Sequence, residues 1–210
     1  MRSRSAFLLV AVLVAGSPSS ITRAQTPTVS PADRFFASVA GLCGKAFAGK
    51  IVVNQPTPAT ADPFEGKSLI FHVRGCGKER LELPFHVGED RSRTWVLTRK
   101  DGAISLKHDH RHTDGSPDDL TMYGGLTLQP GTAMRQEFPA DADTKDLFTR
   151  LKLPVSIPNV WAMEIETGKR FVYELARPGR LFRVEFDLTR EVDPSPAPWG
   201  HETNRRTEPD

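Results

Sequence analysis

Apolar residues recur at every second position along several segments of the chain. The alternation is clearest in residues 69–74, 81–87 and 180–188, where Leu, Phe and Val face one way and mostly polar residues face the other. Successive side chains of a strand point to opposite faces of its sheet, so this period marks a strand with one buried face. The pattern therefore predicts a predominantly β protein.

Short turns punctuate these segments. Asp-Gly and Gly-containing pairs of this kind are strong hairpin signals, and strands joined by tight turns pair antiparallel. About ten such strands fit between residues 25 and 192, and closing the sheet removes its exposed edges. The sequence predicts a single all-β domain, an antiparallel up-and-down β-barrel, with a two-sheet β-sandwich as the alternative. The turns that support the hairpins are Lys100-Asp101-Gly102, Thr167-Gly168 and Arg177-Pro178-Gly179.

Two segments have helical rather than strand character. Ser30 and Pro31 suit the start of a helix, Asp33 places an acid in its first turn, and Gly41 ends it. We expect this short N-terminal helix to lie as a plug over the structure that follows. Residues 141–151, with an acidic start, predict a second short helix.

The N-terminus has the composition of a secretory signal peptide. Arg2 and Arg4 precede an apolar run over residues 6–16, and the polar stretch after it ends in Ala24, a residue suited to cleavage. The run is shorter than the roughly 20 residues that span a bilayer. We expect residues 1–24 to be removed and the protein to be periplasmic or secreted from a bacterium. The alternative is a short uncleaved anchor; no later segment predicts a stable membrane span.

Charge and cysteine content agree with export. Losing Arg2, Arg4 and Arg23 leaves 25 basic residues against 26 acidic ones, so we expect no nucleic-acid partner. Cys43 and Cys76 form an even pair without a Cys-x-x-Cys motif, which in an exported chain predicts one disulfide bond.

The C-terminal segment, residues 193–210, contains four prolines and few apolar residues. Such a composition buries too little apolar surface to offset the entropy of ordering, so we expect a disordered tail.

Three of the six histidines fall in the run from Lys107 to His112. On a strand, His108, His110 and His112 project to one face, which they share with Ile104 and Leu106. If that apolar face lines the barrel, the histidines point inward or lie at its mouth.

The histidine run admits three interpretations. It is a set of hydrogen-bonded structural groups, a polar ligand site, or a zinc site built on the His108 and His110 pair. The third histidine lies too far along a straight strand to share the ion, so zinc needs a ligand from another strand. Our candidates for that ligand are His72, Glu164 and Glu174.

Two neighbouring features add candidates for a ligand site. Tyr123 precedes the pair Gly124-Gly125, and adjacent glycines in a strand allow a bulge or a close approach of another backbone. Tyr123 then presents its hydroxyl to a ligand, or it is an ordinary core residue. Arg91 and Arg93 could clamp an anion, although a solvated loop is the simpler interpretation.

A resemblance rests on five short stretches of the chain. Together they are similar to a group of secreted bacterial proteins with no assigned activity, and the resemblance covers about residues 42–188. It implies export and a shared fold, and nothing catalytic. The strand pattern alone also resembles lipocalin-like (calycin) barrels. The five stretches are Leu42-Cys43-Gly44-Lys45, Phe85-His86-Val87-Gly88, Ser92-Arg93-Thr94-Trp95, residues 107–112 and residues 121–125.

These observations favour a periplasmic β-barrel that binds a small molecule or an ion in its interior or at its mouth. The alternatives are a zinc-dependent hydrolase or lyase using His108 and His110, and a structural or interaction protein of the envelope. The absence of the Gly-x-Ser-x-Gly, Walker and His-Glu-x-x-His motifs leaves no specific catalytic assignment. Zinc is the one candidate cofactor, and the sequence predicts no particular oligomeric state.

Overall fold

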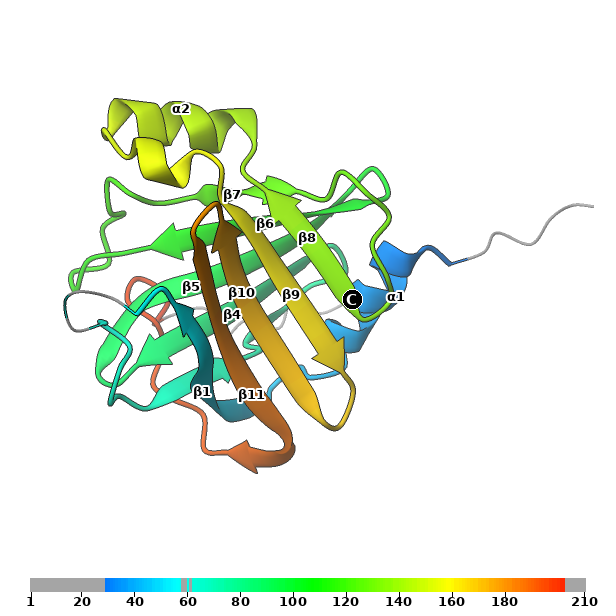
Figure 1. Ribbon diagram of the computed structural model, residues 1–210. Helices are drawn as coiled ribbons and strands as arrows, with labels where there is room; N and C mark the ends of the chain where they lie inside the picture. The colour runs from blue at the N-terminus through cyan, green and yellow to red at the C-terminus, as the bar shows by residue number, and fades with distance from the viewer. Residues whose placement is uncertain (1–28, 58–59, 61, 203–210) are drawn as a thin grey trace, which may run out of the picture.

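The computed structural model describes residues 29–57, 60 and 62–202, and the predicted signal peptide lies outside them. Within this range the chain is an all-β protein with two short α-helices, as the sequence predicts (Figure 1). The helices are α1 (Pro31–Ala40) and α2 (Ala142–Arg150), and a 3-10 turn, η1 (Pro154–Ser156), follows α2.

Ten antiparallel strands form one continuous sheet in the order β7-β6-β5-β4-β2-β1-β11-β10-β9-β8, and the small strand β3 pairs with β4. The sheet is a nearly closed barrel, which confirms the predicted fold over the two-sheet alternative. The strands are β1 (Ala46–Gln55), β2 (Leu69–His72), β3 (Gly75–Cys76), β4 (Arg80–Val87), β5 (Asp90–Lys100), β6 (Ala103–His110), β7 (Tyr123–Leu126), β8 (Arg135–Pro139), β9 (Val160–Glu166), β10 (Arg170–Arg177) and β11 (Arg180–Val192).

The helix α1 closes one end of the barrel. Its Ser30 cap accepts a hydrogen bond from the Asp33 amide at 3.0 Å, and it packs against β6, β8 and β9. Phe35 and Val39 of its apolar face have no exposed surface. Beyond its end, Cys43 forms the predicted disulfide bond with Cys76 of β3. This arrangement agrees with the expected plug.

Aromatic side chains fill the interior of the barrel. The Phe71 and Phe171 rings lie 4.6 Å apart, and the Trp95 ring stacks on both Phe85 and Tyr173 at 4.7 and 4.5 Å. These rings are all at most 8 % exposed. The middle of the barrel is therefore packed with side chains.

The opposite end of the barrel, which we call the mouth, is where β5 and β11 begin and β6 and β10 end. The helix α2 lies beside it, at the top of Figure 1, and contacts β7. The Phe148 ring of α2 reaches the rings of Tyr123 and Trp161, at 5.6 and 6.5 Å. From the loop after β1, Phe64 packs on Phe85 and Phe182.

The described part of the Pro-rich tail, residues 193–202, lies against the outside of the barrel, although its composition predicts disorder. The Trp199 amide donates to the Arg91 carbonyl at 3.1 Å, and Arg91 donates to the Ala197 carbonyl at 3.0 Å. His201, 9 % exposed, contacts the Asp109 carboxylate at 3.1 Å. These specific polar contacts order a segment that has few apolar residues.

None of the helices in the described part of the chain is long and apolar enough to cross a membrane.

The barrel closes where β7 meets β8, through the isolated bridge between Gly125 and Ala140. A Cβ atom on Gly125 would lie 1.9 Å from the Pro139 carbonyl oxygen, and one on Gly124 would lie 1.9 Å from the Leu106 carbonyl oxygen. Both carbonyl oxygens belong to the main chain, so no side-chain rotation would remove the steric clash with an added Cβ atom. The two glycines therefore allow the close approach that the sequence predicts.

Gly125→Ala is expected to lower the free energy of unfolding by more than about 3 kcal/mol, because β7 and β8 must separate to admit the methyl group. The matched control is Gly168→Ala, in a turn with open space around it and a φ of 72°. It costs only the left-handed backbone strain of about 1 kcal/mol. Urea unfolding of both variants measures the difference, and equal losses would show that β7 does not lie this close to β8.

Candidate functional site

His108 lies inside the barrel, just below the mouth. It follows Ile104 and Leu106 on the inward face of β6, as the alternation predicts, and only 2 % of its surface is exposed. Its ring stacks on Tyr123 at 4.6 Å, with the planes 9° apart, and lies 5.1 Å from Trp161. His108 is therefore part of the aromatic layer beneath the mouth.

Both ring nitrogens of His108 have partners. Nδ1 lies 3.1 Å from the Tyr123 carbonyl oxygen, and Nε2 lies 2.8 Å from the Tyr173 hydroxyl. A carbonyl oxygen only accepts, so Nδ1 carries the hydrogen. Burial lowers the pKa of His108 to about 3, so the neutral ring accepts at Nε2 and Tyr173 donates. The sequence gives no signal for Tyr173 beyond its inward position on β10.

An unusual main-chain conformation places Tyr123 over His108. Met122 has a φ of 53°, although it is not a glycine, and Gly124 has a φ of 154°. The Met122 amide donates to the His108 carbonyl at 2.6 Å. On the other side, Thr144 of α2 accepts from the Gly124 amide and donates to its carbonyl, both at 2.8 Å. These contacts hold Tyr123 facing inward between β6 and β8.

His110 occupies the next inward position, at the mouth itself. Its Nε2 lies 3.2 Å from the Tyr123 hydroxyl, and its ring centroid is 6.5 Å from that of His108. No described residue forms a hydrogen bond with Nδ1 of His110, and this atom is not among the fully buried unpaired atoms. His110 therefore keeps one ring nitrogen free to meet a ligand or water.

A second group of contacts supports the backbone of this site from outside the barrel. Thr121 accepts from the His110 amide at 2.8 Å, and its hydroxyl lies 3.4 Å from the Asp109 carboxylate. Asp109 is 5 % exposed and also binds Arg111 and His201. The tail residue His201 is thus connected to the strand that carries His108 and His110.

His112 lies apart from the other two histidines. It follows the end of β6, is exposed, and belongs to a turn in which its carbonyl accepts from the Gly115 amide at 2.9 Å. The strand ends at His110, so the alternation no longer directs His112 inward. The structure brings together His108, His110 and Tyr123, and leaves His112 outside this group.

The predicted third zinc ligands are also placed elsewhere. Glu164 and Glu174 lie on the outer face of the barrel, where both bind Arg135 and Arg183. His72 stands at the end of β2, away from the mouth. Among the described residues no group of three histidine, cysteine or acidic side chains could hold a metal ion. His108 could ligate a metal only by giving up a hydrogen bond.

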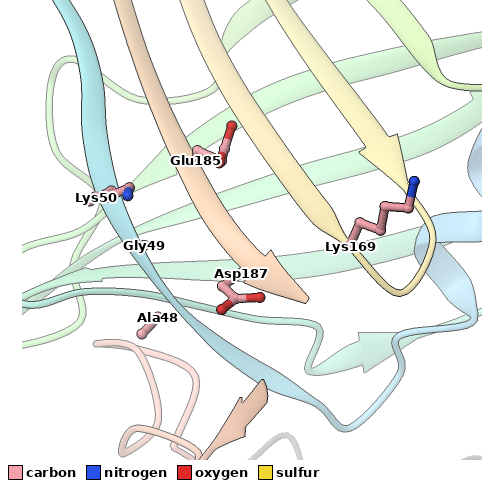
Figure 2. Close-up of a pocket in the computed structure, with 6 residues that line it drawn as sticks. All are labelled: Ala48, Gly49, Lys50, Lys169, Glu185 and Asp187. Carbon is pink, nitrogen blue, oxygen red and sulfur yellow. The ribbon is translucent and has the colours of Figure 1, made fainter. Parts of the chain in front are cut away.

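An open groove of about 340 Å³ lies on the outer surface of β1 and β11, far from these histidines (Figure 2). Its charged lining is partly paired already: Glu185 binds Arg170 at 3.1 Å, and Lys169 binds Glu166 at 2.5 Å. In Figure 2 the Lys169 ammonium group points away from Asp187. None of the site residues predicted from the sequence lines this groove, and we do not place the functional site there.

Comparison of the chain with protein-family models, curated proteins and solved structures finds no match. The barrel likeness therefore rests on the structure alone, and the resemblance to a group of secreted bacterial proteins stays an expectation.

Three histidines are held uncharged by the fold. Burial, together with the positive charge of Arg93 for His110 and of Arg91 for His86, lowers the pKa of each of these two histidines to about 4. A histidine whose folded pKa lies below its unfolded value stabilises the protein above about pH 6.5. That stability is lost as the pH falls from about 6.5 toward 4, because the unfolded chain binds the proton first.

We expect the free energy of unfolding of the wild-type protein to fall between pH 7 and pH 5. His110→Gln removes one titrating group and keeps a hydrogen-bonding group near Tyr123. The free energy of unfolding of this variant should therefore fall less than that of the wild type between the two pH values, by up to about 2 kcal/mol. Urea unfolding of both proteins at pH 7 and pH 5 measures the two losses in the free energy of unfolding. Equal losses in the two proteins would mean that His110 titrates normally in the folded state.

Proposed function

We propose that the protein is an exported β-barrel of the periplasm that binds a small molecule or ion at its mouth, against His110 and Tyr123. Within the described residues, this is where inward-facing polar side chains converge near the barrel end. His110 offers one free ring nitrogen, and the Tyr123 hydroxyl beside it completes a pair of hydrogen-bonding groups.

The observation that carries the proposal is the strained segment that positions Tyr123. A left-handed φ at a non-glycine residue costs roughly 1–3 kcal/mol and tends to persist at functional sites. Met122 has this conformation, while its own side chain is 45 % exposed and buries little in return. We attribute this strain to the position of Tyr123: the strained segment holds the Tyr123 ring over His108 and the Tyr123 hydroxyl beside His110.

The packing of the barrel supports a ligand at the mouth rather than deep inside. The aromatic layer from Phe71 to Trp95 occupies the middle, and α1 covers the far end. The disulfide bond between Cys43 and Cys76 agrees with an oxidising compartment such as the periplasm.

The test is to purify the mature protein, residues 25–210, from a bacterial periplasm under native conditions and to identify co-purified small molecules by mass spectrometry. We expect one compound in near-stoichiometric amount. Its dissociation constant should rise about 3- to 10-fold in Tyr123→Phe and in His110→Gln, since each loses one hydrogen bond worth about 1 kcal/mol.

The control is Thr149→Ala on the exposed face of α2, away from the barrel interior, which should retain the compound. Absence of any bound compound, together with no change in tryptophan fluorescence on adding the small-molecule fraction of a periplasmic extract, would contradict the proposal. It would favour the alternative of an envelope interaction protein.

A further inference from the structure

Three arginines face inward at the mouth. Arg93 precedes Trp95 and Leu97 on the inward face of β5, and Arg177 follows Tyr173 on that of β10. Arg180 precedes Phe182 on β11 and pairs with Arg177 across the hairpin. The strand period places all three side chains on the same face as the core. Basic residues at three inward positions are uncommon in a barrel whose other inward positions are largely apolar.

Most of the donor groups of Arg93 are unused. Its Nη1 binds the Asp90 carboxylate at 2.5 Å, and its guanidinium carbon lies 5.4 Å from the centre of the Phe64 ring. No other described residue forms a hydrogen bond or an ion pair with the Arg93 guanidinium. A guanidinium has five N–H groups in a planar fork suited to a carboxylate or a phosphate. Its side chain is 21 % exposed and none of its nitrogens is a fully buried unpaired atom, so the unused N–H groups can meet a ligand or water.

Arg177 has no carboxylate partner among the described residues. Its Nη1 donates to the Asn159 side-chain oxygen at 3.2 Å, and Asn159 is 5 % exposed. Burial and the adjacent charge of Arg180 lower the pKa of Arg177. Arg180 bonds mainly to main-chain oxygens, and its nearest carboxylate, that of Asp62, is 3.9 Å away.

Aromatic rings connect the two sides of this arginine group. Phe64, beneath Arg93, lies 5.3 Å from Phe182, and the Arg180 guanidinium carbon lies 5.5 Å from the centre of the Phe182 ring. Arg93 also lies directly opposite His110 where β5 pairs with β6, on the same inward face. Arg93 therefore faces the proposed ligand site directly.

Carboxylates also lie at the mouth, and two of them, Asp90 and Asp62, pair with Arg93 and Arg180. Asp90 is engaged with Arg93 and the Ser92 amide, and Asp62 with Asn54 and the Phe64 amide. Asp118 accepts from the Leu120 amide, and its own amide donates to the His110 carbonyl at 3.0 Å. Each of these acids is already hydrogen-bonded to the protein, whereas Arg93 and Arg177 retain free donors.

We propose that the compound bound at the mouth is a small organic anion whose carboxylate or phosphate group is held by Arg93, Arg177 and Arg180. This inference rests on the proposed function and names the ligand class for that site. The apolar part of such a compound would lie against Phe64 and Phe182, whose rings already carry the arginines. His110 and Tyr123 would add hydrogen bonds to the same group.

The experiment titrates the mature protein with four probes: benzoate, phenyl phosphate, benzyl alcohol and benzylamine. These share one ring and differ in charge, and the first two separate a carboxylate from a phosphate. Trp161, 5.6 Å from Tyr123, is the fluorescent reporter. We expect at least one anion to bind with a dissociation constant of about 1 mM or lower, and the alcohol and amine to bind at least 10-fold more weakly.

Arg93→Gln and Arg177→Gln should each weaken binding of the anion about 10-fold or more, since hydrogen bonds to charged groups are the strong ones. Arg190→Gln, exposed near the end of β11, is the control and should bind as the wild type does. Higher salt should weaken anion binding to the wild type.

Binding of benzylamine or benzyl alcohol as tight as that of the anions, or anion binding unchanged in both arginine variants, overturns the inference. If a compound co-purifies, depends on His110 and Tyr123, and carries no anionic group, the ligand class is wrong while the proposed function stands. If no anion binds and no compound co-purifies, both fail.

Discussion

The close approach of three main-chain segments around Gly124 and Gly125 decides both the closure of the barrel and the geometry of its mouth. No side chain fits between β7 and the carbonyl groups of Leu106 and Pro139. The same approach turns Tyr123 inward, so that its carbonyl accepts from His108 and its hydroxyl meets His110. Because His108 is then fully bonded and uncharged, it can lie in the aromatic core without an unpaired polar atom. One backbone constraint thus shapes the fold and the candidate site together.

Much of the fold is predictable from the sequence because its signals are local. The alternation in residues 81–87 and the turn at Asp101-Gly102 depend on neighbouring residues only, and they identify β4 and the β5–β6 hairpin. The pairing of Cys43 with Cys76 follows from there being two cysteines in the chain. The docked tail is different: Trp199 and His201 find their partners, Arg91 and Asp109, about a hundred residues away. Composition carries no information about such distant contacts.

The candidate site is predictable in part, for the same reason. The period of two predicts that His108 and His110 share the face of Leu106, but not that the strand ends before His112. Glu164 and Glu174, candidate zinc ligands by residue type, face outward and bind arginines. The residues at the mouth come from β5, β6, β7, β10 and β11. The hydrophobic pattern of one sequence does not predict which strands lie opposite one another across a barrel. Arg177 and Arg180 look like ordinary turn residues until the barrel brings them to the same end as Arg93.

The most direct test of this account is the protonation of the His108 ring, measured by nitrogen-15 NMR of the histidine side chains between pH 7.5 and 5. The contacts with Tyr123 and Tyr173 require a neutral ring with its hydrogen on Nδ1 throughout this range. A hydrogen on Nε2 at neutral pH, or a titration near the ordinary value of about 6.5, would contradict it. Either result would mean that Tyr123 does not lie over His108 and that the mouth is built differently.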